Sequence, residues 1–86
     1  MKRHILIIDD HPIVRHGMAQ FINQLPGMQV CCEASNPDEA IAAMNLCQHN
    51  LVVVDISLGN QSGIELIKEL LSLYPQLPIL VMSKYL

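Results

Sequence analysis

The chain has 86 residues, 51% of them apolar, which suits one small domain and leaves too little material for a second. Its net charge of −3, with five lysines and arginines, excludes the basic surface that a nucleic-acid-binding domain needs. The apolar runs are strand-sized, far below the roughly 20 residues of a membrane span, and no signal-peptide core follows Met1, so we expect a cytoplasmic protein without membrane contact.

The first third of the sequence predicts a strand, a helix and a second strand. Residues 4–9 give the first strand, and apolar residues then recur at helical spacing until Pro26 and Gly27 stop the helix. From Met28 onward apolar and polar residues alternate, a period of two that indicates an edge strand with one better-covered face. That face is expected to carry Met28, Val30, Cys32 and Ala34.

The start of a second helix is signalled by three residue types in order. Asn36 supplies a cap, Pro37 fits the first helical position, and Glu39 fits the third. The inner stripe of this helix is expected to comprise Ala40, Ile41, Ala43, Met44 and Cys47. The three cysteines do not have CxxC spacing, which indicates reduced, structural thiols. His49 is expected to be solvated or partly packed.

The last part of the chain predicts a central strand, a long loop, a third helix and a fourth strand. Leu51 to Ile56 is apolar without alternation, as a strand covered on both faces should be. A polar, glycine-bearing segment over 59–63 follows, and helical spacing resumes from Ile64 to Tyr74. Residues 79–83 give the last strand, so the order is β-α-β-α-β-α-β, which right-handed crossovers wind into a parallel α/β sheet.

Polar side chains end three of these strands at what is expected to be one edge of the sheet. Asp9 and Asp10 follow the first strand, Asp55 ends the third, and Ser83 ends the fourth. Ligands of open parallel α/β sheets bind at the carboxyl edge. The sequence therefore predicts an acidic site there.

Several carboxylates in a small volume repel one another, and a hard divalent cation, usually Mg²⁺, relieves that repulsion. We expect Asp10 to bind the metal directly and Asp9 through water; the alternative is that this pair only caps the next helix. Asp55 can accept a phosphoryl group as a mixed anhydride. Ser83 either donates to a phosphoryl oxygen or is an ordinary turn residue, and His11 either joins this chemistry or simply begins the helix.

The sequence resembles a response-regulator receiver domain, in particular the group that precedes a LuxR/NarL-type helix-turn-helix domain. The resemblance rests on the segment from Ile7 to Gly17, on Glu33–Asn36, on Val54-Asp55-Ile56 followed by the helix start at Gly63, and on residues 79–83, in the family's order and spacing. It covers the whole chain. It implies a flavodoxin-like (CheY-like) fold with the strand order 2-1-3-4 over the part present.

For individual residues, the resemblance implies that Asp9 and Asp10 bind Mg²⁺ and that Asp55 is phosphorylated by a sensor histidine kinase. The backbone carbonyl of Ser57 would complete the metal shell, and Ser83 would be the switch hydroxyl. A DNA-binding output domain would lie outside this chain. These are the properties of a switching module rather than an enzyme.

Two departures from the family pattern stand out. Leu58-Gly59-Asn60 replaces the usual Met-Pro-Gly turn, which removes a proline that restricts the loop. Residues 1–86 also match only the N-terminal portion of the receiver, without its fourth helix, fifth strand and fifth helix. The family's phosphate-binding lysine would be among the missing residues, because Lys84 does not match its position. We therefore expect weakened phosphorylation, and a homodimer or swapped oligomer built on the exposed last strand.

Three rival functions remain at this point. A Mg²⁺-dependent phosphohydrolase would need a general acid two residues after Asp55, where the chain has Ser57. A nucleotide-binding domain would need a glycine-rich phosphate loop, which the residues after the first strand do not provide. A degenerate receiver that only binds proteins would keep the same acidic residues.

Overall fold

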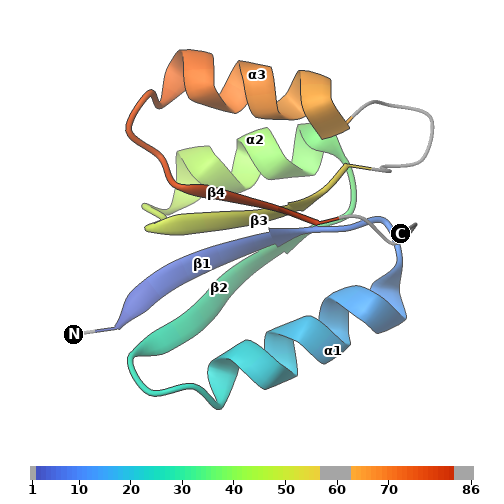
Figure 1. Ribbon diagram of the computed structural model, residues 1–86, viewed down its shortest axis with the longest axis vertical. Helices are drawn as coiled ribbons and strands as arrows, with labels where there is room; N and C mark the ends of the chain where they lie inside the picture. The colour runs from blue at the N-terminus through green and yellow to red at the C-terminus, as the bar shows by residue number, and fades with distance from the viewer. Residues whose placement is uncertain (1, 57–62, 83–86) are drawn as a thin grey trace.

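The computed structural model describes residues 2–56 and 63–82 and has a parallel sheet between two layers of helices (Figure 1). The strands are β1 (Arg3–Ile8), β2 (Met28–Ala34), β3 (Leu51–Asp55) and β4 (Ile79–Met82), in the order β2-β1-β3-β4. The helices are α1 (Pro12–Asn23), α2 (Pro37–Leu46) and α3 (Gly63–Leu73). Helices α2 and α3 cover one face and α1 covers the other. The predicted α/β fold and strand order are confirmed.

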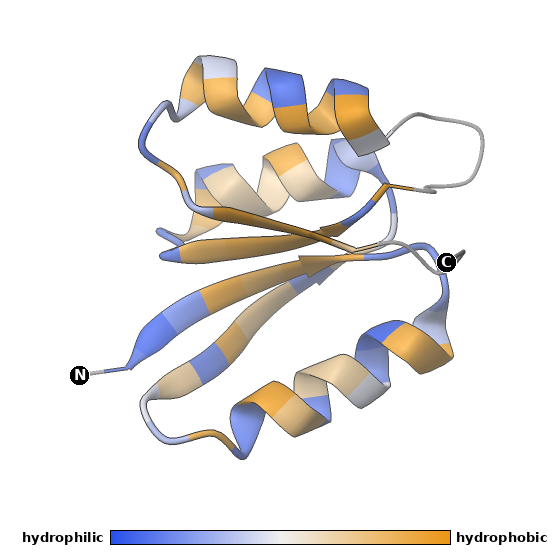
Figure 2. Cartoon of the chain, viewed as in Figure 1, coloured by the Kyte–Doolittle hydropathy of each residue, from blue (hydrophilic) through white to orange (hydrophobic). Residues whose placement is uncertain are grey.

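The two faces of the sheet bury two separate apolar clusters, because successive strand residues point to opposite sides. On the face under α2 and α3, Leu6 and Ile8 pack with Val52 and Val54. On the face under α1, Ile5 and Ile7 pack with Val53. Figure 2 shows β3 and the end of β1 as continuously hydrophobic, the pattern that a strand covered on both faces requires.

Strand β2 contains an irregularity that corrects the predicted alternation. Ile5 pairs with Val30, but the next residue, Leu6, pairs with Cys32, so Cys31 is an extra residue in a β-bulge. As a result, Met28 and Val30 pack against the α1 cluster, whereas Cys32 and Ala34 belong to the opposite cluster. The expectation that these four residues share one face is wrong, since the bulge shifts the register by one residue.

Helix burial differs in detail from the predicted apolar stripes. In α1 only Ala19 is fully buried, and Ile13 and Phe21 stay 88% and 64% exposed. Cys47 follows α2 as an exposed residue rather than a member of its inner stripe. A single helix against a strongly twisted four-stranded sheet covers a narrow strip, so apolar residues at the margin of its stripe remain in contact with solvent.

The start of α2 has the predicted capping arrangement. The side chain of Asn36 accepts a hydrogen bond of 2.8 Å from the backbone N–H of Glu39. The carboxylate of Glu39 in turn accepts from the backbone N–H and the hydroxyl of Ser35, at 2.8 and 2.7 Å. These bonds satisfy backbone donors that a helix leaves unpaired and fix the turn between β2 and α2.

Strand β4 lies at one edge of the described sheet and pairs with β3, from Ile79 opposite Val52 to Met82 opposite Asp55. Leu80 and Val81 are 57% and 47% exposed. Within the described ranges, no helix has the length and hydropathy to cross a bilayer.

Candidate metal centre at the carboxyl edge of the sheet

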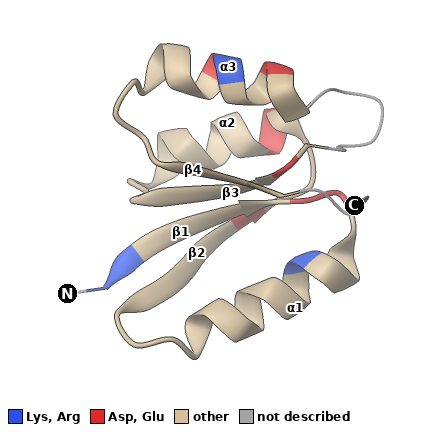
Figure 3. Cartoon of the chain, viewed as in Figure 1, with Lys and Arg blue, Asp and Glu red and all other residues tan. Residues whose placement is uncertain are grey.

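Three carboxylates and one imidazole converge where β1 and β3 end. Asp9, Asp10, His11 and Asp55 each place one possible ligand atom within 4.8 Å of the others. Asp9 and Asp55 are fully buried, while the side chains of Asp10 and His11 are 28% and 53% exposed. Figure 3 shows acidic residues at these strand ends, on the side of the molecule where α1 and α3 begin.

Asp9 is held by hydrogen bonds at three of its groups. Its backbone N–H donates to the carbonyl of Ala34 at 2.9 Å, which continues the pairing of β1 with β2 past the last strand residue. Its Oδ1 accepts from the backbone N–H of His11 at 2.8 Å, and its carbonyl accepts from Nη1 of Arg15 at 2.8 Å. The chain therefore fixes this carboxylate before any ligand binds.

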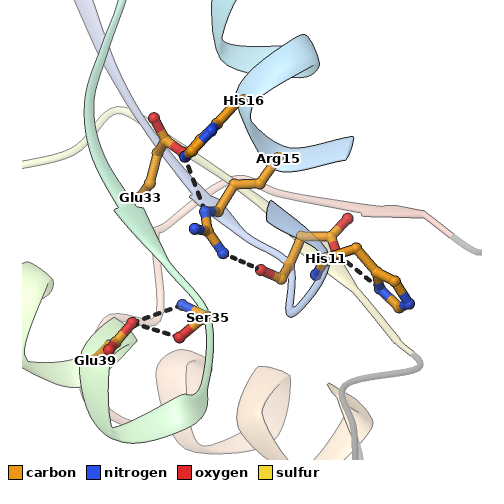
Figure 4. Close-up of polar contacts among 7 residues, drawn as sticks. His11, Arg15, His16, Glu33, Ser35 and Glu39 are labelled. Carbon is orange, nitrogen blue, oxygen red and sulfur yellow. Dashed lines mark hydrogen bonds and ion pairs between the residues drawn. The ribbon is translucent and has the colours of Figure 1, made fainter. Parts of the chain in front are cut away.

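Charged side chains on α1 and β2 hold the backbone that follows β1. Nε of Arg15 lies 3.0 Å from Oε1 of Glu33, and Nε2 of His16 lies 3.4 Å from the same oxygen (Figure 4). The single guanidinium thus connects Glu33 on β2 to the carbonyl of Asp9 at the end of β1. Sequence reasoning missed this connection, because nothing local relates an arginine in one helix to a glutamate 18 residues later.

His11 begins α1, and its imidazole lies beside the acidic residues. It is the N-cap residue of α1, without a capping bond from its side chain. Its Nδ1 also lies 2.8 Å from Oδ1 of Asp10 and 3.4 Å from Oδ1 of Asp9, so the imidazole belongs to the acidic cluster. Asp9 accepts a hydrogen bond from the backbone N–H of His11, in line with the expectation that Asp9 and Asp10 only cap α1. The two carboxylates also lie close to Asp55, which capping alone does not require.

Asp55 reaches the cluster because β3 lies next to β1 in the centre of the sheet. After it, the backbone N–H of Ile56 donates to the carbonyl of Met82 at 3.0 Å, which ties the strand end to β4. Gly63 then approaches this strand end so closely that an added Cβ would lie 2.5 Å from Cα of Ile56 and 2.7 Å from the carbonyl oxygen of Asp55. Only glycine fits there without a shift of the backbone that carries Asp55.

Ser57 and Ser83, the two remaining residues of the predicted site, lie outside the described residues, as do the Leu58-Gly59-Asn60 segment and Lys84. The residues that are described fit a hard divalent cation. They offer carboxylate oxygens from three side chains, two of them buried at a strand end, and Mg²⁺ prefers oxygen donors.

Comparison with known families decides the classification. Residues 5–86 match the model of the response regulator receiver domain. The chain belongs to the response-regulator receiver family. The resemblance that the sequence motifs indicated is therefore confirmed, and Asp9, Asp10 and Asp55 lie at the carboxyl edge of a receiver fold.

Relatives of this receiver domain include transcriptional regulators and protein-glutamate methylesterase/protein-glutamine glutaminases. It is 33% identical over 81 residues to the DNA-binding transcriptional activator DevR/DosR of Mycobacterium tuberculosis (strain ATCC 25618 / H37Rv), covering 94% of this chain and 37% of that protein. A LuxR-family two-component response regulator from Aurantimonas sp. SI85-9A1 has a TM-score of 0.92 at 30% identity, over 100% of this chain and 61% of that one.

The isolated receiver domain of RcsB from Salmonella enterica serovar Typhimurium, solved with the phosphomimetic BeF₃⁻, has a TM-score of 0.86 at 27% identity, over 96% of this chain and 62% of that one. The receiver chain described here therefore spans just over a third of the DevR/DosR sequence and about three fifths of these two solved chains.

Proposed function

We propose that this chain is the phosphoryl-accepting module of a cytoplasmic two-component response regulator. Asp55 is the acceptor, a sensor histidine kinase is the donor, and Mg²⁺ is the cofactor. The observation that carries the proposal is the approach of three carboxylates to within 4.8 Å across the ends of two neighbouring strands. Receiver-family membership supports the same chemistry, as does the RcsB receiver domain solved in the presence of the phosphomimetic BeF₃⁻.

In the proposed reaction, a carboxylate oxygen of Asp55 forms a bond to phosphorus while the bond from phosphorus to a kinase histidine nitrogen breaks. The histidine keeps the electron pair of that bond and takes up a proton, and Asp55 becomes an acyl phosphate. Bound Mg²⁺ would neutralise charge on the transferring group. The chain's own contribution is to hold Asp55 on a buried strand end, so that its carboxylate is oriented before the donor arrives.

For the metal shell, we propose Asp10 as a direct ligand, Asp9 as a ligand through water, and Asp55 with the backbone carbonyl of Ser57 as the remaining protein donors. The partial exposure of Asp10, against full burial of Asp9, favours this division. Arg15 would help to position Asp9 for this role, because its guanidinium holds the backbone carbonyl of Asp9 in place.

The proposed output is control of DNA binding by a domain outside these 86 residues, with Ser83 as the hydroxyl that responds to the phosphoryl group. The transcriptional role of DevR/DosR favours this output over a receiver that only binds proteins. The proposal assigns no catalysed turnover of a substrate to this chain.

The test is to incubate the chain with Mg²⁺ and a small phosphodonor such as acetyl phosphate, and to locate any added phosphoryl group by intact-mass and peptide mass spectrometry. We expect Mg²⁺-dependent, substoichiometric and short-lived modification of Asp55. Asp55→Asn should remove the modification, while Asp38→Asn, a first-turn carboxylate of α2, should leave it unchanged. Modification that persists in Asp55→Asn or needs no Mg²⁺ would refute the proposal.

A further inference from the structure

A second group of metal-ligating side chains lies away from the acidic site. Cys31 and Cys32 on β2 and His49, in the connection between α2 and β3, place one ligand atom each within 4.8 Å of the others. The α2–β3 connection is at the amino ends of the strands, and the acidic cluster is at their carboxyl ends (Figure 1). The two groups therefore share no residue and lie at different ends of the fold.

The β-bulge explains how two consecutive cysteines reach the same partner. In a regular strand the side chains of neighbouring residues point to opposite faces of the sheet. Here the register shift between Ile5 and Leu6 leaves Cys31 unpaired as the bulged residue, which re-aims its side chain. Bulges are often found where a strand presents side chains for a function.

His49 also points to a bound ligand at this group of residues. The residue is 9% exposed, and neither ring nitrogen has a hydrogen-bond partner in the described part of the chain. Buried polar atoms are nearly always hydrogen-bonded, so an imidazole with two unpartnered nitrogens beside two thiols indicates a missing ligand. His49 and Cys47 also line an open cavity of about 580 Å³ that extends to Tyr74 and Pro78.

We propose that Cys31, Cys32 and His49 form a second metal site, which binds a borderline-soft d¹⁰ cation, Zn²⁺ in the test below. Two thiolates and one imidazole are ligands that zinc uses, and they are unsuited to the hard Mg²⁺ of the acidic site. Zn²⁺ would displace the two thiol protons to solvent water, so the ion with two thiolates and one neutral imidazole has no net charge. Water would take the fourth position, on the side of the cavity.

In the metal-free protein both thiols are protonated at neutral pH, so metal binding has to displace their protons. Burial, followed by the neighbouring Cys47, raises the pKa of both thiols, that of Cys32 to about 11. Burial, followed by the charge of His4, lowers the pKa of His49, and the nearby backbone of Cys47 offsets part of this without a hydrogen bond of good geometry. The imidazole is thus neutral at neutral pH, the form that binds metals.

The experiment uses Co²⁺ as a spectroscopic substitute for Zn²⁺, in the full chain, under a phosphine reductant and with excess Mg²⁺ to occupy the acidic site. We expect one Co²⁺ per chain with a sulfur-to-cobalt charge-transfer band and the intense visible bands of tetrahedral coordination, both removed by Zn²⁺. Cys31→Ser, Cys32→Ser and His49→Gln should each lower the affinity by roughly 100-fold or more, since loss of a supporting residue alone costs 10–100-fold.

Two controls separate this site from its neighbours. Cys47→Ser removes a nearby exposed thiol that is not one of the three proposed ligands, and it should retain the charge-transfer band. Asp55→Asn should also retain the band, because the carboxylate site is at the other end of the sheet. Circular dichroism of each variant checks that it folds, and Zn²⁺ should raise the melting temperature of wild type but not of Cys32→Ser.

Three results would overturn the proposal. One is the absence of a charge-transfer band in protein whose three cysteines are shown, by reaction with a thiol reagent, to be reduced. Another is a band that depends on Cys47 but not on Cys31 or His49, which would place the metal elsewhere. The third is zinc binding that Asp55→Asn removes and the cysteine variants keep, which would assign all binding to the acidic site.

Discussion

Nη1 of Arg15 donates a 2.8 Å hydrogen bond to the backbone carbonyl of Asp9, and Nε of the same guanidinium binds Glu33. The arginine side chain is 13% exposed, so water competes poorly for these bonds. We expect Arg15→Ala to lower the free energy of unfolding by about 1–3 kcal/mol, the range for loss of charge-assisted hydrogen bonds. Denaturant titration measures this loss.

The same substitution should weaken Mg²⁺ binding, because the carbonyl of Asp9 loses its anchor. Arg15→Lys keeps the positive charge but lacks the planar guanidinium that binds both partners. Compared with Arg15→Ala, it should therefore restore only part of the stability and of the Mg²⁺ affinity measured by calorimetry. His16→Ala is the matched control, since this imidazole lies 3.4 Å from the same Glu33 oxygen that Arg15 binds. Equal effects of Arg15→Ala and His16→Ala on Mg²⁺ affinity would contradict the anchoring role.

Gly63→Ala should distort the strand end that carries Asp55. The new methyl group would lie 2.5 Å from Cα of Ile56, a backbone atom that cannot rotate away. We expect a loss of stability of about 1–3 kcal/mol, as for other overpacked sites, and weaker Mg²⁺ binding. The control is Gly17→Ala on α1, where an added Cβ has no atom within 4 Å and should stabilise the helix by about 0.5–1 kcal/mol. Equal stability of the two variants would show that the backbone at the end of β3 shifts at little cost to make room for the methyl group.

The capping carboxylate of Glu39 makes stability depend on acid pH. The backbone N–H of Ser35, followed by its hydroxyl, lowers the pKa of Glu39 in the folded chain. In the unfolded chain the pKa returns to about 4.3, so unfolding is accompanied by proton uptake at acid pH. The stabilisation is therefore complete above the unfolded pKa and is lost as the pH falls through the lowered folded value.

Urea titrations from neutral pH down to about pH 3 test this dependence. Glu39→Gln should reduce the slope of stability against pH in the acid range. Asn36→Ala removes the other half of the cap, costs about 1 kcal/mol at every pH, and should leave the slope unchanged. A slope that Glu39→Gln does not alter would assign the acid sensitivity to other carboxylates.

The β4 edge should make the 86-residue chain associate with itself. Leu80 and Val81 point to opposite faces, and both are about half exposed beside a strand edge, which is a template for pairing with a second chain. We expect light scattering to give a dimer or larger species, and Val81→Lys to shift it toward monomer. Leu71→Lys on α3, another exposed apolar position, is the control. A wild-type chain that is monomeric at high concentration would rule out this association.

The sequence by itself determined the order and type of the elements and the carboxylate set at one sheet edge. Apolar runs ending in Asp9-Asp10 and in Asp55 predicted that these residues meet, since adjacent parallel strands end at the same edge. The capping residues of α2 were equally readable, because a cap is a contact within four residues. The metal-binding role of the Ser57 carbonyl and the switch role of the Ser83 hydroxyl stay predictions.

Only the tertiary structure decided the contacts that depend on the exact register between strands. The bulge at Cys31 is a property of the register between two strands, and local alternation predicts the wrong face for half of β2 because one inserted residue reverses every position after it. The ion pair of Arg15 with Glu33 depends on the same register, as does the approach of Cys31, Cys32 and His49 to within 4.8 Å of one another. Residue patterns encode what is periodic along the chain, whereas the packing of the whole domain fixes the registers that bring such groups together.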